Sequence, residues 1–228
     1  MKKIVITSLM VLFGLGINAQ TCSKYYPFTE GAVSQLTMYN KKGKMQGMVE
    51  YSVEEVGSNG NGETAKMSHK LIDEKGNLIS TSSYDVLCSN GIVSMDFRSL
   101  SRPEMMKQFG EDAEVSVTGT NIDFPNDLSV GQELPDGGIN VKINFSGMNM
   151  NMKTSIVDRK VVGKESVTTP AGTFECYVIT STTVMKMGTN MRNDTKQWIA
   201  EGVGVVKVED YNKSGKVRGM SLLTSFTK

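Results

Sequence analysis

The chain alternates short apolar or β-branched runs with clusters of glycine, asparagine and lysine, a pattern that predicts strands joined by tight turns. Within 65–71, the odd positions carry Ala, Met, His and Leu, while the even positions carry Lys and Ser. Successive residues of a strand point to opposite faces, so this alternation predicts one packed face and one solvated face. The first half holds five such runs, at 37–39, 48–53, 65–71, 78–88 and 92–97.

Turn-forming clusters separate these runs. They lie at 40–44, 58–62, 74–77 and 89–91. Glycine and asparagine supply the positive φ that hairpin turns require. In the second half, the segment 169–172 (Thr-Pro-Ala-Gly) favours another tight turn, because proline fixes φ and glycine accepts a positive value. Strands at this spacing, with no helices between them, predict an antiparallel meander.

One short helix is expected to interrupt the strands, near 102–109. Ser101 is suited to cap its first turn, and Glu104 follows three residues later, as in a capping box. Pro103 suits the first turn of a helix, and Gly110 would end it.

The region that follows is rich in strand patterns and contains no linker rich in proline, serine or charge. Heptads and clean repeats are also absent from the sequence. The segment 20–228 is therefore predicted to be a single all-β domain. We expect an antiparallel meander that forms a curved sheet, a sandwich or an open barrel.

The first nineteen residues have the layout of a secretory signal peptide. Lys2 and Lys3 precede an uncharged apolar run at 4–17, and Ala19 offers a small residue before Gln20. This run has fourteen residues, whereas a helix that crosses a bilayer needs roughly 20. We expect cleavage near Ala19 and Gln20, and export to the periplasm, the outer-membrane surface or the medium.

Composition limits the classes of partner that the mature chain is expected to bind. Removing residues 1–19 leaves 209 residues and lowers the formal charge from +1 to −1, because Lys2 and Lys3 leave. A nearly neutral chain has no general electrostatic reason to bind nucleic acid or acidic lipid. The mature sequence holds no second apolar run long enough to span a bilayer, so no transmembrane anchor is expected in it.

Three cysteines remain after cleavage, and an odd count in an exported protein predicts one disulfide and one leftover thiol. Cys22 lies just after the predicted cut, on a segment that would otherwise fray. Pairing it with Cys88 would close a long loop worth ~4 kcal/mol on the chain-entropy model, so we favour this pair. Cys176 alternates with apolar neighbours and is expected to be buried as a small hydrophobic residue.

Four segments carry a resemblance that covers essentially the mature chain: 22–27, 128–136, 159–179 and 198–209. Their order and spacing resemble the TapB-like family of exported bacterial proteins, which is similar to a broader domain of unknown function. The resemblance implies an all-β fold and a setting in the cell envelope. It implies no reaction and no catalytic residues.

The last of these segments contains Trp198, the only tryptophan of the chain. We expect it to anchor the core, with the floor of a ligand groove as the alternative. Gly202 and Gly204 flank Val203, which indicates a place where a strand bends or another backbone comes close.

Residues able to support catalysis are scarce. His69 is the only histidine, which argues against a conventional zinc enzyme, and its place in the alternating pattern predicts a hydrogen-bonded structural role. The sequence also lacks a Gly-x-Ser-x-Gly elbow, a phosphate-binding loop, paired Cys-x-x-Cys motifs and a dinucleotide fingerprint. No catalytic residue and no cofactor is therefore assigned.

Methionine is unusually frequent, with sixteen residues, and Met148, Met150 and Met152 alternate with asparagine. Three thioethers on one strand face form a candidate Cu(I) site, because soft sulfur ligands select Cu(I). The simpler interpretation is that flexible methionines fill an irregular apolar face. We favour packing, since copper sites usually also recruit a histidine or cysteine, and neither lies beside these residues.

The sequence thus favours an exported, non-catalytic protein that binds an apolar ligand or an envelope partner protein. A Cu(I)-handling protein and a hydrolase without a visible motif are the alternatives. The size of the interior distinguishes binding of an apolar ligand from contact with a partner protein. A large apolar cavity would favour a ligand, and a filled core would favour contact through the surface.

Overall fold

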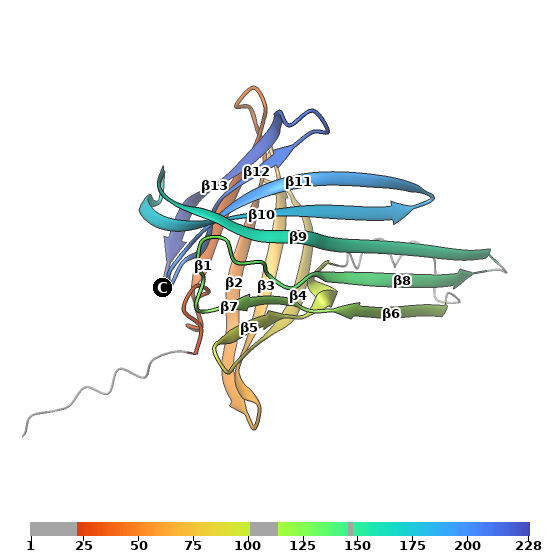
Figure 1. Cartoon of the computed structure of the whole chain (residues 1–228), viewed down its shortest axis with the longest axis horizontal. Helices are drawn as coiled ribbons and strands as arrows, with labels where there is room; N and C mark the ends of the chain where they lie inside the picture. Colours follow the sequence, from red (N-terminus) through yellow and green to blue (C-terminus); the bar gives the residue numbers. More distant parts are fainter. Residues whose placement is uncertain (1–21, 101–113, 146–147) are drawn as a thin grey trace, which may run out of the picture.

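The computed structural model describes residues 22–100, 114–145 and 148–228. Its strands form one curled antiparallel sheet (Figure 1). The all-β meander expected from the sequence is confirmed, in its nearly closed, open-barrel form. The helix expected near 102–109 and the signal peptide lie outside the described residues; the one helical element that the structure describes is a single 3-10 turn, η1, at Phe97–Leu100.

The strands follow the predicted turns closely. They are β1 Val33–Asn40, β2 Met45–Asn59, β3 Gly62–Asp73, β4 Leu78–Ser89, β5 Ile92–Met95, β6 Glu114–Thr120, β7 Ile122–Pro125, β8 Gly137–Phe145, β9 Met148–Thr169, β10 Gly172–Met187, β11 Thr189–Ala200, β12 Gly204–Tyr211 and β13 Val217–Thr227. Within the described part of the chain, no helix is long and apolar enough to span a membrane.

Two features of the strand order curl the sheet. Its order is β6-β8-β9-β10-β11-β12-β13-β1-β2-β3-β4-β5-β7, so β1 pairs with β13 and joins the first and second halves of the chain. The two edge strands, β6 and β7, are consecutive in sequence and are separated only by Asn121. This residue holds the junction to the β5 side, because its Oδ1 accepts from Phe97 N at 3.1 Å and its Nδ2 donates to Ser94 Oγ at 3.1 Å.

Beyond the curled part, five strands continue as a projecting arm (Figure 1). We define the arm as the distal parts of β6, β8, β9, β10 and β11, residues 114–117, 141–145, 148–153, 184–187 and 189–192, and the rest of the sheet as the curl. A small apolar cluster of Ile139, Val141 and Ile143 lies at the base of the arm, against Phe97 and Met152.

The curl contains the two larger apolar clusters. One comprises alternate residues of several strands, such as Val53, Met67 and Val86, together with the N-terminal aromatic residues. The other surrounds Trp198, which is 2% exposed, and includes the free Cys176. The structure thus confirms Trp198 as a core anchor and the burial of Cys176.

Candidate ligand cavity

The inside of the curl contains a partly open cavity of about 360 Å³. Most of its wall is apolar, with side chains from strands that are far apart in sequence. Leu36 on β1, Met67 on β3, Ile122 on β7 and Ile156 on β9 are among them. A few polar groups also reach the wall, chiefly those of Tyr51, His69, Tyr84, Arg159 and Gln197.

The residues of the cavity wall follow from the alternation of side chains between the two faces of each strand. Val49, Tyr51 and Val53 line the cavity from β2, and Met67 and His69 line it from β3. Residues two apart share one face of a strand, so alternating apolar positions converge once the sheet curls. The alternation around His69 therefore correctly predicted which face is packed.

The residues after the predicted leader form the floor of the cavity. Tyr26 lines the cavity, and its ring packs edge-on against Phe124, with ring centroids 5.5 Å apart. Gly204, with φ at +86°, makes room for this ring, because an added Cβ would lie 3.2 Å from Tyr26 Cδ1. We call residues 22–28 the floor segment.

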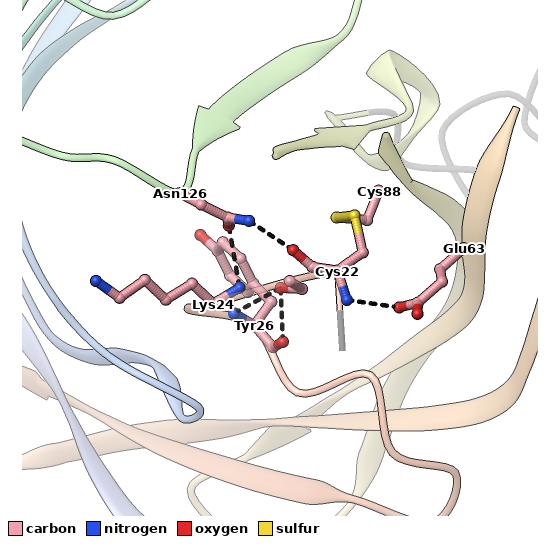
Figure 2. Close-up of a disulfide and its surroundings, with 7 residues drawn as sticks. Cys22, Lys24, Tyr26, Glu63, Cys88 and Asn126 are labelled. Carbon is pink, nitrogen blue, oxygen red and sulfur yellow. Dashed lines mark hydrogen bonds between the residues drawn. A yellow bond between two sulfur atoms is a disulfide. The ribbon is translucent and has the colours of Figure 1, made fainter. Parts of the chain in front are cut away.

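Covalent and polar contacts hold the floor segment in place (Figure 2). Cys22 forms a disulfide with Cys88 on β4, as predicted, and its backbone N donates to Glu63 Oε2 at 2.9 Å. Asn126 contributes both halves of its side-chain amide: Nδ2 donates to Cys22 O, and Oδ1 accepts from Lys24 N at 3.0 Å. The floor segment is therefore attached both to β4 and to the loop after β7.

The turn between β11 and β12 supports the same segment. Gly202 N donates to Lys24 O at 2.9 Å, so another backbone does come close at the glycine pair, as the sequence indicated. Gly202 and Gly204 both have positive φ, at 66° and 86°, and they form the turn itself.

His69 lies between two tyrosines on the cavity wall. Its ring centroid is 5.9 Å from that of Tyr51 and 6.2 Å from that of Tyr84, and burial raises the pKa of both phenols. Ser82 Oγ lies 2.9 Å from Nε2 and 3.4 Å from Nδ1 of His69. At 2.9 Å the hydroxyl is within hydrogen-bonding distance of Nε2, and the tautomer of the ring decides which group donates. The contact fits a hydrogen-bonded structural histidine.

Arg159 is the most unusual group in the wall, with only 3% of its surface exposed. Its Nη1 donates to Asp123 O at 3.0 Å and to Pro135 O, and its Cζ lies 4.6 Å from the ring centroid of Phe124. Its Nη2 is buried and has no hydrogen-bond partner among the described residues. Burial lowers the pKa of this guanidinium, yet arginine keeps its charge in proteins.

A bulge in β9 brings Arg159 to the inside. Ile156 and Arg159 both line the cavity although they are three residues apart, whereas a regular strand would place residues two apart on one face. The register to β10 shifts opposite Thr180 and Thr182, and Asp158 has a φ of 54°. An extra residue of this kind re-aims the next side chain. Leu134 N then covers the bulge by donating to Arg159 O at 2.9 Å.

The cavity differs between its two ends. Around the floor segment, Tyr26, Val53 and Phe124 are buried. At the opposite end, Val49 and the directly paired Val208 and Ser221 are only half-buried. We call this half-buried end the mouth.

The other sequence candidates lie elsewhere. Met150 and Met152 lie in the arm, where Met150 is 38% exposed and Met152 packs on the small cluster at the arm's base; Met148 begins β9. Ala19 and Gln20 lie outside the described residues. Of the residues that the structure does describe, no group of three His, Cys, Asp or Glu side chains is placed to hold a metal ion.

Sequence reasoning missed Arg159 as a site residue. Arg159 opens the segment 159–179, but its charge suggests a solvated position, and only the bulge at Asp158 turns it inward. The signal that could have found it is the break in alternation between Ile156 and Val161, where a charged pair, Asp158 and Arg159, interrupts a strand pattern.

Two solved structures share this fold over 91% of the chain and the whole of their own length. One is a "putative lipoprotein" from Parabacteroides distasonis, with 24% identity and a TM-score of 0.72. The other is a "putative exported protein with YmcC-like fold" from Bacteroides fragilis, with 22% identity and a TM-score of 0.71. A family model described as DUF3108-like matches residues 29–223, and no curated protein matches the sequence.

Proposed function

Since this chain belongs to the DUF3108-like family and carries an apolar cavity within the matched residues, we propose that it binds an apolar small molecule without catalysing a reaction. The cavity is the observation that carries the proposal. Protein interiors are close-packed, and a volume of about 360 Å³ falls within the range of about 300–1,000 Å³ that small-molecule sites occupy.

The composition of the wall also supports a ligand. Small-molecule sites combine mostly apolar walls with a few polar groups that fix the orientation of the ligand. The cavity has this arrangement: its apolar side chains are joined by Tyr51, His69 and Arg159. The cluster around Trp198 supplies Leu36 to this wall, while Trp198 itself does not line the cavity.

We propose that binding takes place outside the cytoplasm. The leader pattern around Ala19 and Gln20 supports export, and the Cys22–Cys88 disulfide fits an oxidising compartment. The solved relatives named as a lipoprotein and an exported protein agree with this setting. Membership of the narrower TapB-like family, and the choice between periplasm, outer-membrane surface and medium, stay predictions.

Contact with an envelope protein is the second candidate, and the arm supports it. Met187 and Met191, at the tip of the β10–β11 hairpin, are 47% and 56% exposed. Exposed apolar side chains of this kind are common at protein interaction sites when they form a continuous patch. The cavity is the stronger argument because its wall is mostly apolar and includes a few polar side chains.

The cavity proposal is tested by titration with N-phenyl-1-naphthylamine, a neutral apolar fluorophore. We expect saturable binding with a stoichiometry of one, and a rise in Kd of at least about tenfold in Ser34→Phe, which fills the cavity. Gln35→Phe is the matched control, because the next residue of β1 does not line the cavity. Equal binding by both variants and the native chain would contradict the proposal.

A further inference from the structure

The buried guanidinium of Arg159 has one half of its hydrogen-bonding fork occupied and the other half free. Nη1 donates to two backbone carbonyls, which hold the side chain against the loops after β7 and before β8. Nη2 is buried without a partner among the residues that the structure describes. A structural role for Arg159 accounts for Nη1 but leaves Nη2 unexplained, and an unsatisfied buried donor is costly.

The charge of Arg159 is also uncompensated by direct contact. Two carboxylates lie near enough to stabilise it electrostatically, those of Asp123 and Asp136, but the described residues supply no ion pair with it. Asp123 Oδ1 instead accepts from Ser94 Oγ at 2.6 Å, and Asp136 is exposed to solvent. A buried charge without a paired partner is unfavourable, so an anion in the cavity beside the guanidinium would stabilise the site.

The position of Arg159 determines the shape of such an anion. Arg159 contacts Phe124, beside the floor segment, while the opposite end of the cavity is the half-buried mouth. Apolar side chains, including Met67 and Val205, line the space. A ligand that satisfies both features has an anionic head at the floor and an apolar chain that extends towards the mouth.

Resting on the proposed function, we infer that the cavity takes an amphipathic carboxylate, an apolar chain whose carboxylate pairs with the guanidinium of Arg159. The planar guanidinium fork matches a carboxylate, and such hydrogen bonds are stronger than those between neutral groups. The apolar walls discriminate little between ligands whose apolar chains have equal length. The head group of the ligand therefore determines which of them binds more tightly. A cationic amphiphile of the same length is excluded by repulsion from Arg159.

The first test uses the native chain alone. Dodecanoate and dodecanol, both below their aggregation concentrations, compete against bound N-phenyl-1-naphthylamine. We expect dodecanoate to bind about tenfold more tightly than dodecanol or better, as one charge-assisted hydrogen bond would give. Equal affinities, or tighter dodecanol, would overturn the carboxylate while leaving the cavity proposal intact. Absence of fluorophore binding would instead contradict the proposed function itself.

The second test assigns the selectivity to Arg159. In Arg159→Gln, dodecanoate should lose its advantage while dodecanol keeps its affinity, and Arg159→Lys should recover part of the selectivity. Arg218→Gln removes an exposed arginine from β13 and serves as the control with unchanged selectivity. Selectivity retained in Arg159→Gln would overturn the role of this residue. Because the native chain is compared with two ligands, the inference is decided even if a variant at Arg159 folds poorly.

Discussion

The curl and the arm belong to one sheet and follow the same alternating pattern, but the apolar side chains compared below differ in their exposure to solvent. In the curl, Val53 and Met67 are 2% and 6% exposed, and they line the cavity. In the arm, Met150 and Met191 are 38% and 56% exposed. Alternation determines which residues share a face, whereas long-range pairing and the floor segment determine whether that face is covered. The proposed binding function therefore depends on the contacts that close the curl.

Removing the disulfide should have the largest effect and should be confined to the curl. The Cys22–Cys88 bond links residues 66 apart, so a Cys22→Ala, Cys88→Ala variant is expected to lose about 4 kcal/mol of unfolding free energy. Urea unfolding followed by the fluorescence of Trp198 measures this loss. Fluorophore affinity should fall too, because the floor segment is released.

Cys176→Ala is the matched control for that experiment, since Cys176 is buried but unpaired. It should cost clearly less than the double variant and leave ligand affinity unchanged. Amide exchange in the distal strands of the arm should be the same in all three chains. A double variant as stable as the native chain would contradict the role assigned to the floor segment.

Changing the bulge at Asp158 should have the next largest effect. Asp158→Val places a β-branched residue at a φ of 54°, which is expected to cost about 1–3 kcal/mol, while Asp158→Gly accepts this backbone angle. The ion pair of Asp158 with Arg192 joins two exposed side chains and contributes little. Urea unfolding midpoints of the two variants provide the measurement. Equal unfolding midpoints for Asp158→Val and Asp158→Gly would contradict the strain expected from the positive φ at this position.

The smallest effect is expected in the arm. Replacing Met148, Met150 and Met152 together by leucine keeps size and apolarity, and such volume-conserving changes cost less than about 1.5 kcal/mol each. Folding and fluorophore binding should persist. Competition with a Cu(I) chelator under anaerobic conditions should show no copper binding by the native chain. Stoichiometric Cu(I) binding that disappears in the triple variant would instead support the copper alternative.

Local patterns in the sequence predicted much of this fold. The turns at 40–44, 74–77 and 169–172 connect the strands as expected, because glycine, asparagine and proline restrict the backbone locally. The pairing of β1 with β13 depends on residues about 190 apart, and no local pattern encodes it. The sequence also did not show that β6 and β7, which follow each other directly, pair with β8 and β5 at opposite edges of the sheet, because these pairings join separate segments of the chain.

The candidate site was predictable only in part. The inward direction of His69 and the burial of Trp198 followed from period and composition, and the Cys22–Cys88 pair followed from loop closure and cysteine count. Arg159 could not be recognised as a cavity residue, because its inward direction depends on one positive φ at Asp158 and on the carbonyls of two distant loops. Side chains placed by a bulge break the periodicity on which sequence reasoning depends.

The central claim is that the ligand binds in the cavity of the curl and not on the exposed arm. The most direct measurement is the anomalous scattering of bromine in crystals of the protein bound to dodecanoate brominated at its terminal carbon. We predict one bromine peak inside the cavity near Val49 and Val208, with the carboxylate at Arg159. A peak over Met187 and Met191, with no ligand density in the cavity, would contradict the claim.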